Sequence, residues 1–422
     1  MNSNIKDYKS LREEAILMHK NSKASQNYLR DILYKKYNFK VNLSQPSNDA
    51  VSPSSNYAKY EKILGIKFNA RITGGFDVIN TIPDEVQVYT PDSFNITGKK
   101  LFDNSDIYAV FVHAFSEKII YISPKAGKPV NIILDYSNDS YPIQLIIDAR
   151  DKEPSTINEI ILSGKSEELP PSVIMHEISA GKDSNLEFNI LYLGGDSGII
   201  SMLRGNAGEY SKLNINEIYV GNSLTKEESR IISASANAEV NIRKTVAASL
   251  NQKIDLLSDI INNERNTRCD SSLNVIASGN SVCYAKDFAE VKEGAKSSLS
   301  HISQRGIIRD PTASLNMMPD MSINESYTKA SHYSYSSPID RDELFYLESR
   351  GMSEEQAEHL ISLGFFSTNI SMIKDENLKN SAISILDYVL KKKDYHLPEE
   401  LKRIDWEFDG NIGLVKGIKD KK

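Results

Sequence analysis

The chain has 422 residues, of which 40% are hydrophobic and 25% are charged, and its formal net charge is −7. This length suffices for one large solenoid or for two to three ordinary domains. The negative balance argues against a general nucleic-acid-binding role, which needs a basic face. Two cysteines, Cys269 and Cys283, are too few for a disulfide framework or a four-thiolate metal site, so we expect a reducing compartment.

The first twenty residues, MNSNIKDYKSLREEAILMHK, contain no long apolar run and no cleavage-site pattern. They do not read as a signal peptide. No stretch of the chain approaches the roughly 18–20 apolar residues that a membrane helix needs. We therefore expect a soluble cytoplasmic protein.

The N-terminal quarter mixes helix and loop. Apolar residues recur at three- and four-residue steps over 6–36, which predicts helix, and the serine- and proline-rich stretch 42–56 predicts a loop. A short helix is expected over 57–64 and a strand over 85–89. We assign 1–105 to an N-terminal helical and mixed region.

From residue 107 the sequence consists of short runs rich in Ile, Val, Leu and Tyr, separated by turn-forming segments such as GGDSG and GNAGEYS. The first run, IYAVFVHAF at 107–115, is taken as a strand, whereas 249–264 fits a strand or a helix. Many short strands at regular spacing indicate a sandwich, a barrel or a solenoid. Their number favours a mainly β fold, a parallel β-helix over 106–338, although no crisp rung motif is visible.

The C-terminal region, 339–422, carries the clearest helix signals. Asp340 and Glu343 have the spacing of a capping box, and Gly351 suits a left-handed helix end. A second box, at Ser353 and Gln356, begins a helix that we expect to end at Gly364. A third helix is predicted over about 375–391.

Several side chains are candidates for chemistry. If 328–336 is a strand, His332 shares a face with small residues, where it is either a ligand or a hydrogen-bonded residue at a domain seam. Cys269 and Cys283 are either thiolate ligands or small buried hydrophobic residues. His113, His176 and His301 show no metal-triad spacing. No G-x-x-x-x-G-K-[ST] motif occurs, so we expect no ATP site in this chain.

The segment SHYSYSSPIDRDELFYLESRGMSEEQAEHLISLGFF resembles the end of the SufB/SufD family of iron–sulfur cluster assembly proteins. In that family a strand ending in a histidine motif leads into an LFYL-x-SRG helix. The matching residues here are Ser331, His332, Ile339, Asp340, Leu344, Phe345, Tyr346, Leu347, Ser349, Arg350, Gly351, Ala357, Gly364 and Phe365.

The resemblance implies a right-handed parallel β-helix flanked by N-terminal and C-terminal α-helical domains. It implies an assembly subunit, without enzymatic activity of its own, that docks a SufC-type ABC ATPase and pairs with a SufB-type β-helix subunit or with itself as a homodimer. A transient iron–sulfur cluster would lie at the subunit interface, with His332 as a candidate ligand, and flavin involvement is left open. The ATPase would contact the C-terminal helices through Asp340, Leu344, Phe345, Tyr346, Arg350, Gly351, Gly364 and Phe365.

Two departures favour a SufD-like subunit. SufB proteins follow the histidine with a glutamate, where this chain has Tyr333, and they carry an upstream cysteine where this chain has Thr312. The alternatives are a SufB-like scaffold that carries the nascent cluster and a β-helix enzyme acting on polysaccharide. No membrane and no nucleic-acid partner is expected.

Overall fold

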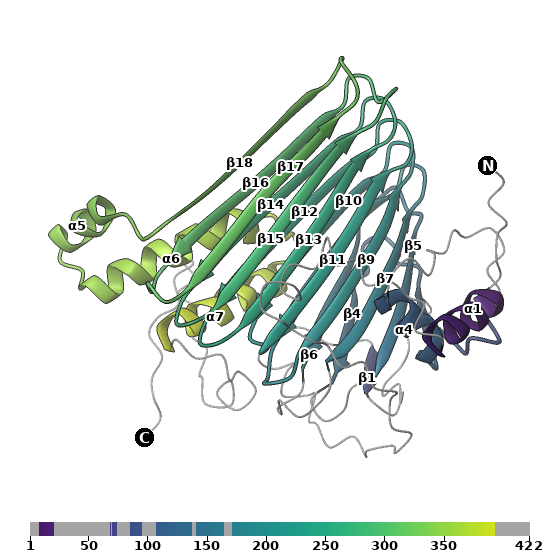
Figure 1. Cartoon of the computed structure of the whole chain (residues 1–422), viewed down its shortest axis with the longest axis horizontal. Coiled ribbons are helices and arrows are strands. Elements are labelled where there is room, and N and C mark those ends of the chain that lie inside the picture. The colour runs from purple at the N-terminus through teal and green to yellow at the C-terminus, as the bar shows by residue number, and fades with distance from the viewer. Residues whose placement is uncertain are drawn as a thin grey trace.

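Two nine-stranded sheets face each other and form a parallel solenoid (Figure 1). The computed structural model describes residues 8–20, 68, 70–73, 85–94, 107–136, 141–163 and 171–392. The first sheet, in spatial order, contains β1 (Ala70–Thr73), β4 (Val130–Asp135), β6 (Ser155–Leu162), β8 (Asn185–Leu193), β10 (Lys212–Val220), β12 (Glu239–Ala248), β14 (Arg268–Ala277), β16 (Leu299–Ile308) and β18 (Lys329–Ser337). The second sheet contains β17 (Ser314–Ile323), β15 (Val282–Val291), β13 (Lys253–Asn262), β11 (Leu224–Ser233), β9 (Ile199–Ala207), β7 (Ser172–Ala180), β5 (Pro142–Ala149), β3 (Ile119–Ile122) and β2 (Val86–Tyr89). The predicted parallel β-helix is therefore confirmed.

Each turn of the solenoid stacks on the previous one in parallel register, whereas β2, at the end of the second sheet, pairs antiparallel with β3. Lys212 of β10 pairs with Glu239 of β12, which pairs with Arg268 of β14, and so on to the end of the sheet. Hydrogen bonds between neighbouring turns join residues that are typically 27 to 31 positions apart. Because this spacing varies from turn to turn, no fixed-period motif is visible in the sequence.

The core lies between the two sheets, where alternate residues of each strand point inward. One inner column of the first sheet consists of Val130, Ile157, Phe188, Ile215, Ile242, Ser271, Ile302 and His332. All of its members except His332 are buried. Each turn thus covers the apolar side chains of the turn before it, as expected for a solenoid.

The run at 107–115 is not a strand but a helix, α4 (Ile107–Phe115). Its Phe111 and Val112 pack on Val173 and Met175 of the second sheet, and the helix α1 (Tyr8–Lys20) packs against α4. A helix that is apolar on all sides is one that is covered on all sides. Periodicity could not reveal it, because a uniformly apolar run fits a buried strand equally well.

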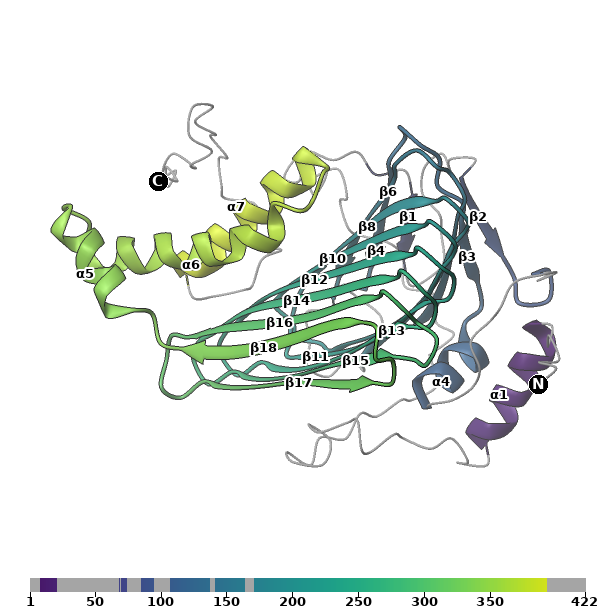
Figure 2. The ribbon, with the colours of Figure 1, turned by 90° about the horizontal axis from the view of Figure 1, so that it is seen from above.

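Three helices follow the solenoid: α5 (Arg341–Ser349), α6 (Glu354–Ile370) and α7 (Glu376–Lys392). The last two lie across the outer face of the first sheet, while α5 projects beyond the sheets (Figure 2). Phe366 and Ile370 of α6 belong to one buried apolar cluster with Leu191 and Ile218 of the sheet. Burying this layer stabilises the helices, which are too short to be stable alone.

Both predicted helix starts are confirmed, although at Asp340 only the N-cap bond forms and not the reciprocal bond from Glu343. Asp340 accepts a hydrogen bond from the backbone N–H of Asp342, and both halves of the capping box are present at Ser353. Gly351 has a φ of +93°, but Gly364 lies inside α6, so the helix end predicted there is wrong.

The ambiguous stretch at 249–264 contains the strand β13. The loop predicted over 42–56 and the helix over 57–64 lie outside the described residues, as does the predicted helix beyond residue 20. Among the helices that the structure describes, none is long and apolar enough to cross a membrane.

Candidate functional site

The last turn of the solenoid is formed by β17 and β18, which are the terminal strands of the two sheets. All nine residues of β18 are exposed. In the described part of the chain, neither strand has a neighbour on its outer edge. Such an edge presents unpaired backbone N–H and C=O groups and is a template for pairing with another strand.

His332 points into the solenoid from this last turn. It is in register with Ile302 of β16, which is completely buried, but no further turn covers the imidazole. Its neighbours on the same face are small, namely Ala330, Ser334 and Ser336. The histidine therefore has free space around it at the open end of the core.

The outer face of β18 carries an aromatic group that the sequence reading did not assemble. The rings of Tyr333 and Tyr335 are stacked with centroids 6.4 Å apart, and Tyr333 lies 5.6 Å from the ring of His301. His301 also hydrogen-bonds to Ser331 through Nδ1 at 2.8 Å. The sequence alone does not show that His301 lies near Tyr333, because the contact depends on the register between β16 and β18.

Helix α5 is the most exposed element of the C-terminal region. None of its residues is buried, and Phe345 and Tyr346 are 70% and 57% exposed. The Arg350 guanidinium lies 5.2 Å from the Tyr346 ring centroid, in cation–π range. The same helix carries three acidic side chains, Asp342, Glu343 and Glu348, and two more, Glu354 and Glu355, begin α6.

The predicted partner-binding residues divide into two groups. Asp340, Leu344, Phe345, Tyr346, Arg350 and Gly351 lie in α5 or at its ends. Gly364 and Phe365 instead lie inside α6, where Phe365 packs on the helical layer and the guanidinium of Arg305 covers its ring at 5.2 Å. The structure brings the first group together at α5, whereas Phe365 packs toward the solenoid and Gly364 is exposed on α6.

The two thiols lie in the core. Cys269 of β14 and Cys283 of β15 are 1% and 0% exposed. Burial raises the pKa of the Cys269 thiol to about 12, against the effect of Ser233, whose Oγ lies 3.1 Å from Sγ. Burial also raises the pKa of Cys283, and the nearby Asp255 adds to this effect. Both side chains are therefore neutral and inaccessible, as small hydrophobic residues are.

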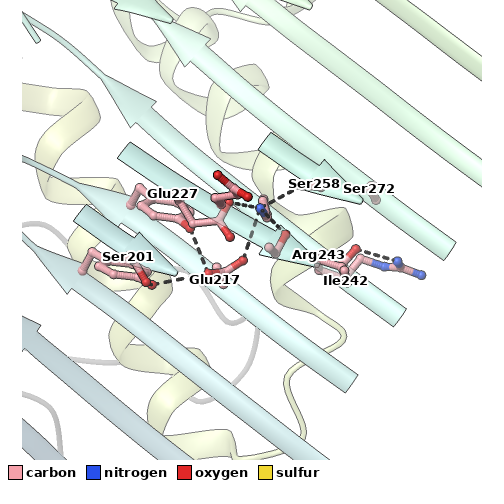
Figure 3. Close-up of polar contacts among 12 residues, drawn as sticks. Ser201, Glu217, Glu227, Ile242, Arg243, Ser258 and Ser272 are labelled. Carbon is pink, nitrogen blue, oxygen red and sulfur yellow. Dashed lines mark hydrogen bonds and ion pairs between the residues drawn. The ribbon is translucent and has the colours of Figure 1, made fainter. Parts of the chain in front are cut away.

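A polar network that the sequence did not indicate occupies the middle of the solenoid (Figure 3). Lys244 contacts Glu227 and lies 3.6 Å from Glu217, and the three side chains come from three different strands. Further along, His176 contacts Glu159 at 2.9 Å inside the core. No local pattern signals this network, because its charged members are ten or more residues apart in the chain.

A family model for the SUF system FeS cluster assembly, SufBD core domain, matches residues 134–365, which is more than half of the chain. An iron–sulfur cluster assembly SufBD family protein of Synechocystis sp. is 23% identical over 37% of this chain and 33% of its own length. A chloroplastic SufBD family protein of Arabidopsis thaliana is 22% identical over 47% and 38%. The iron–sulfur cluster assembly protein SufD of Bacillus subtilis is 26% identical over 24% and 23%. The chain thus spans between 23% and 38% of the length of these relatives.

Proposed function

The chain belongs to the SufBD core family of the SUF system for iron–sulfur cluster assembly, and from that membership we propose that it is a SufD-like subunit of the assembly complex. In this role it docks a SufC-type ABC ATPase through α5 and pairs with a second β-helix subunit through its last turn. ATP hydrolysis is supplied by the partner, and this chain acts in the cytoplasm as a non-enzymatic assembly subunit.

The observation that carries the docking proposal is the isolated position of α5. No residue of α5 is buried, and Phe345 and Tyr346 are exposed to solvent. These two aromatic side chains therefore add no stability to the fold of this chain. Exposed aromatic side chains with a polar rim are typical of binding surfaces. The acidic residues of α5 itself favour a partner whose apolar groove is bordered by lysine or arginine.

The edges of β17 and β18 support the pairing proposal. Both edges lie at the same end of the solenoid, so a second solenoid can extend both sheets at once. The exposed rings of Tyr333 and Tyr335 lie beside this edge and would be covered in the process. A SufB-type subunit is the proposed partner, and a second copy of this chain is the alternative, since the same edge can pair with itself.

The cargo of the complex is an iron–sulfur cluster, and His332 is the proposed ligand in this chain. Imidazole is an acceptable ligand for iron, although clusters prefer thiolates. Because Cys269 and Cys283 are enclosed in the core, this chain offers its cargo no accessible thiolate among the described residues. The absence of an accessible thiolate favours the SufD-like role over a SufB-like scaffold. Membership of the SufBD core family argues against the alternative of a polysaccharide-acting enzyme.

Co-expression of the chain with the ABC-type ATPase of its own SUF system tests the docking proposal. The wild type is expected to retain the ATPase during affinity purification, and the double variant Phe345→Ala/Tyr346→Ala is expected to lose most of it. Both side chains are exposed, so the variant should keep its fold. Met372→Ala, which removes another exposed apolar side chain, is the matched control and should retain the ATPase. Equal retention by the double variant would refute docking through α5.

A further inference from the structure

The polar network inside the solenoid contains more acidic groups than basic ones. The ammonium group of Lys244 contacts a carboxylate oxygen of Glu227, lies 3.6 Å from Oε2 of Glu217 and donates to Ser258 Oγ at 2.9 Å (Figure 3). All these side chains are buried. Two carboxyl groups therefore compete for one cation in a region without access to water.

The charge balance of this cluster is unfavourable if both carboxyl groups are ionised. One lysine would then neutralise only one of them, and a buried unpaired charge costs several kcal/mol. Groups in this situation avoid the cost by binding a proton. Two interacting carboxyl groups then share that proton as a unit.

Neutral donors favour the ionised form of one member of the pair. Tyr219 donates to Glu217 Oε1 at 2.9 Å, and Tyr192 lies 3.4 Å from the same oxygen. The two tyrosine rings are stacked with centroids 4.4 Å apart. Oε2 of Glu217 and Oε1 of Glu227 each have no hydrogen-bond partner, so each carboxyl group has an oxygen that can carry the proton. The tyrosines favour the ionised form of Glu217 and Lys244 favours that of Glu227, so the two carboxyl groups share the proton.

We propose that Glu217, Glu227 and Lys244 form a buried proton-binding site, in which the two carboxyl groups hold one proton between them. The site is independent of ATPase docking and of cluster chemistry. Its ligand is the proton alone. Release of that proton leaves a net negative charge inside the solenoid and weakens the middle turns.

Within the described part of the chain, charged and titratable groups from several strands face this site. The charged and titratable side chains around Glu227 are Tyr192 of β8, Glu217 and Tyr219 of β10, Lys244 of β12 and Asp287 of β15, with the His176–Glu159 pair further along the core. Asp287 accepts from Gln304 at 3.0 Å, and Gln304 is in register with Ser334 of the last turn. The network therefore extends from the middle of the core to the open end.

The electrostatics support the geometric argument. Burial raises the pKa of Glu227 from 4.5 to about 8, Lys244 opposes this effect, and the charge of Glu217 adds to it. Burial alone would lower the pKa of Lys244, but Glu227 and Glu217 outweigh burial and raise it, so the lysine stays charged. Because the folded-state pKa of Glu227 is raised, its contribution to stability is fully present below pH 4.5 and is lost as the pH rises through about 8.

Infrared spectroscopy of the folded full-length chain tests the proposal directly. A protonated buried carboxyl has a C=O stretch distinct from that of a carboxylate. We expect the wild type to show this band at about pH 6.5 and to lose it by about pH 9.5, beyond the raised pKa. Glu227→Gln is expected to lack the pH-dependent band, and Glu209→Gln, which alters a partly exposed carboxylate paired with Lys182, should keep it.

Thermal unfolding provides a second measurement. Between about pH 6 and about pH 9 the melting temperature of the wild type should fall by several degrees more than that of Glu227→Gln. If Glu227→Gln does not fold, the infrared titration of the wild type still shows whether a buried carboxyl group is protonated at neutral pH. The proposal would be overturned if the wild type showed no such band at neutral pH, or if Glu227→Gln kept the full pH dependence of both signals.

Discussion

His332 owes its exposure to its place at the end of an inner column. In every earlier turn of that column the next turn covers the side chain, as His332 itself lies over Ile302. At the last turn an apolar residue would be left open to water, whereas an imidazole is well solvated there. The same position would be buried if a second solenoid continued the stack, which is where a ligand for a shared cluster would lie.

Replacing His332 by alanine should reduce binding of the iron–sulfur cluster without changing the stability of the chain. Because the side chain is exposed, we expect the free energy of unfolding to change by less than about 0.5 kcal/mol. After reconstitution of the complex with iron and sulfide, cluster absorbance should fall several-fold. His301→Ala, which removes an imidazole from the outer face of the adjacent strand, should keep the absorbance. Full absorbance in His332→Ala would contradict the proposed ligand role.

The buried thiols should be chemically inert in the folded chain. Only the thiolate reacts readily, and burial raises the pKa of Cys269 to about 12 while excluding reagents from the core. We expect mass spectrometry to find neither cysteine alkylated after brief iodoacetamide treatment at neutral pH, and both alkylated in denaturant. Rapid labelling of the folded chain would show that a thiolate is accessible and would favour the scaffold alternative.

The two glycines of the C-terminal helices have opposite roles, although the sequence suggested the same role for both. Gly351 has a φ of +93° just after α5, a conformation that side chains with a Cβ avoid. Gly364 lies inside α6, where an added Cβ would meet no atom within 4 Å. In a helix interior glycine is less favourable than alanine, because it loses more conformational entropy on folding.

Matched alanine variants at these glycines should therefore shift stability in opposite directions. Gly364→Ala is expected to raise the free energy of unfolding by about 0.5–1 kcal/mol. Gly351→Ala is expected to lower it by about 1 kcal/mol or more, because of the left-handed backbone. Hydrogen exchange of the α5 and α6 amides would measure both effects. Equal effects of the two substitutions would mean that these helix ends are assigned incorrectly.

An element could be predicted from the sequence when the residues that determine its structure lie close together in the chain. The cap at Ser353 and the strands with clear turn signals could be read from the sequence, because those signals lie within a few residues. Helix α4 and strand β13 could not, since their form depends on what covers them. Lys244 was missed for the same reason: its partners approach it only after two sheets have stacked.

The molecule as a whole is a stack with one covered side and one open end. Helices α6 and α7 cover the outer face of the first sheet, and α4 covers part of the second (Figures 1 and 2). The last turn and α5 are both left uncovered, and α5 follows β18 after only a short connection. A partner on α5 can therefore act on the strands that would pair with a second solenoid.

Affinity purification of the full chain from its native cells tests the proposed role most directly. We predict that an ABC-type ATPase and a second SufBD-family chain are recovered together with it. Deletion of 340–366 should remove the ATPase and leave the second SufBD-family chain, because the last turn of the solenoid is retained. Recovery of neither protein with the intact chain, or undiminished recovery of the ATPase after the deletion, would contradict the account.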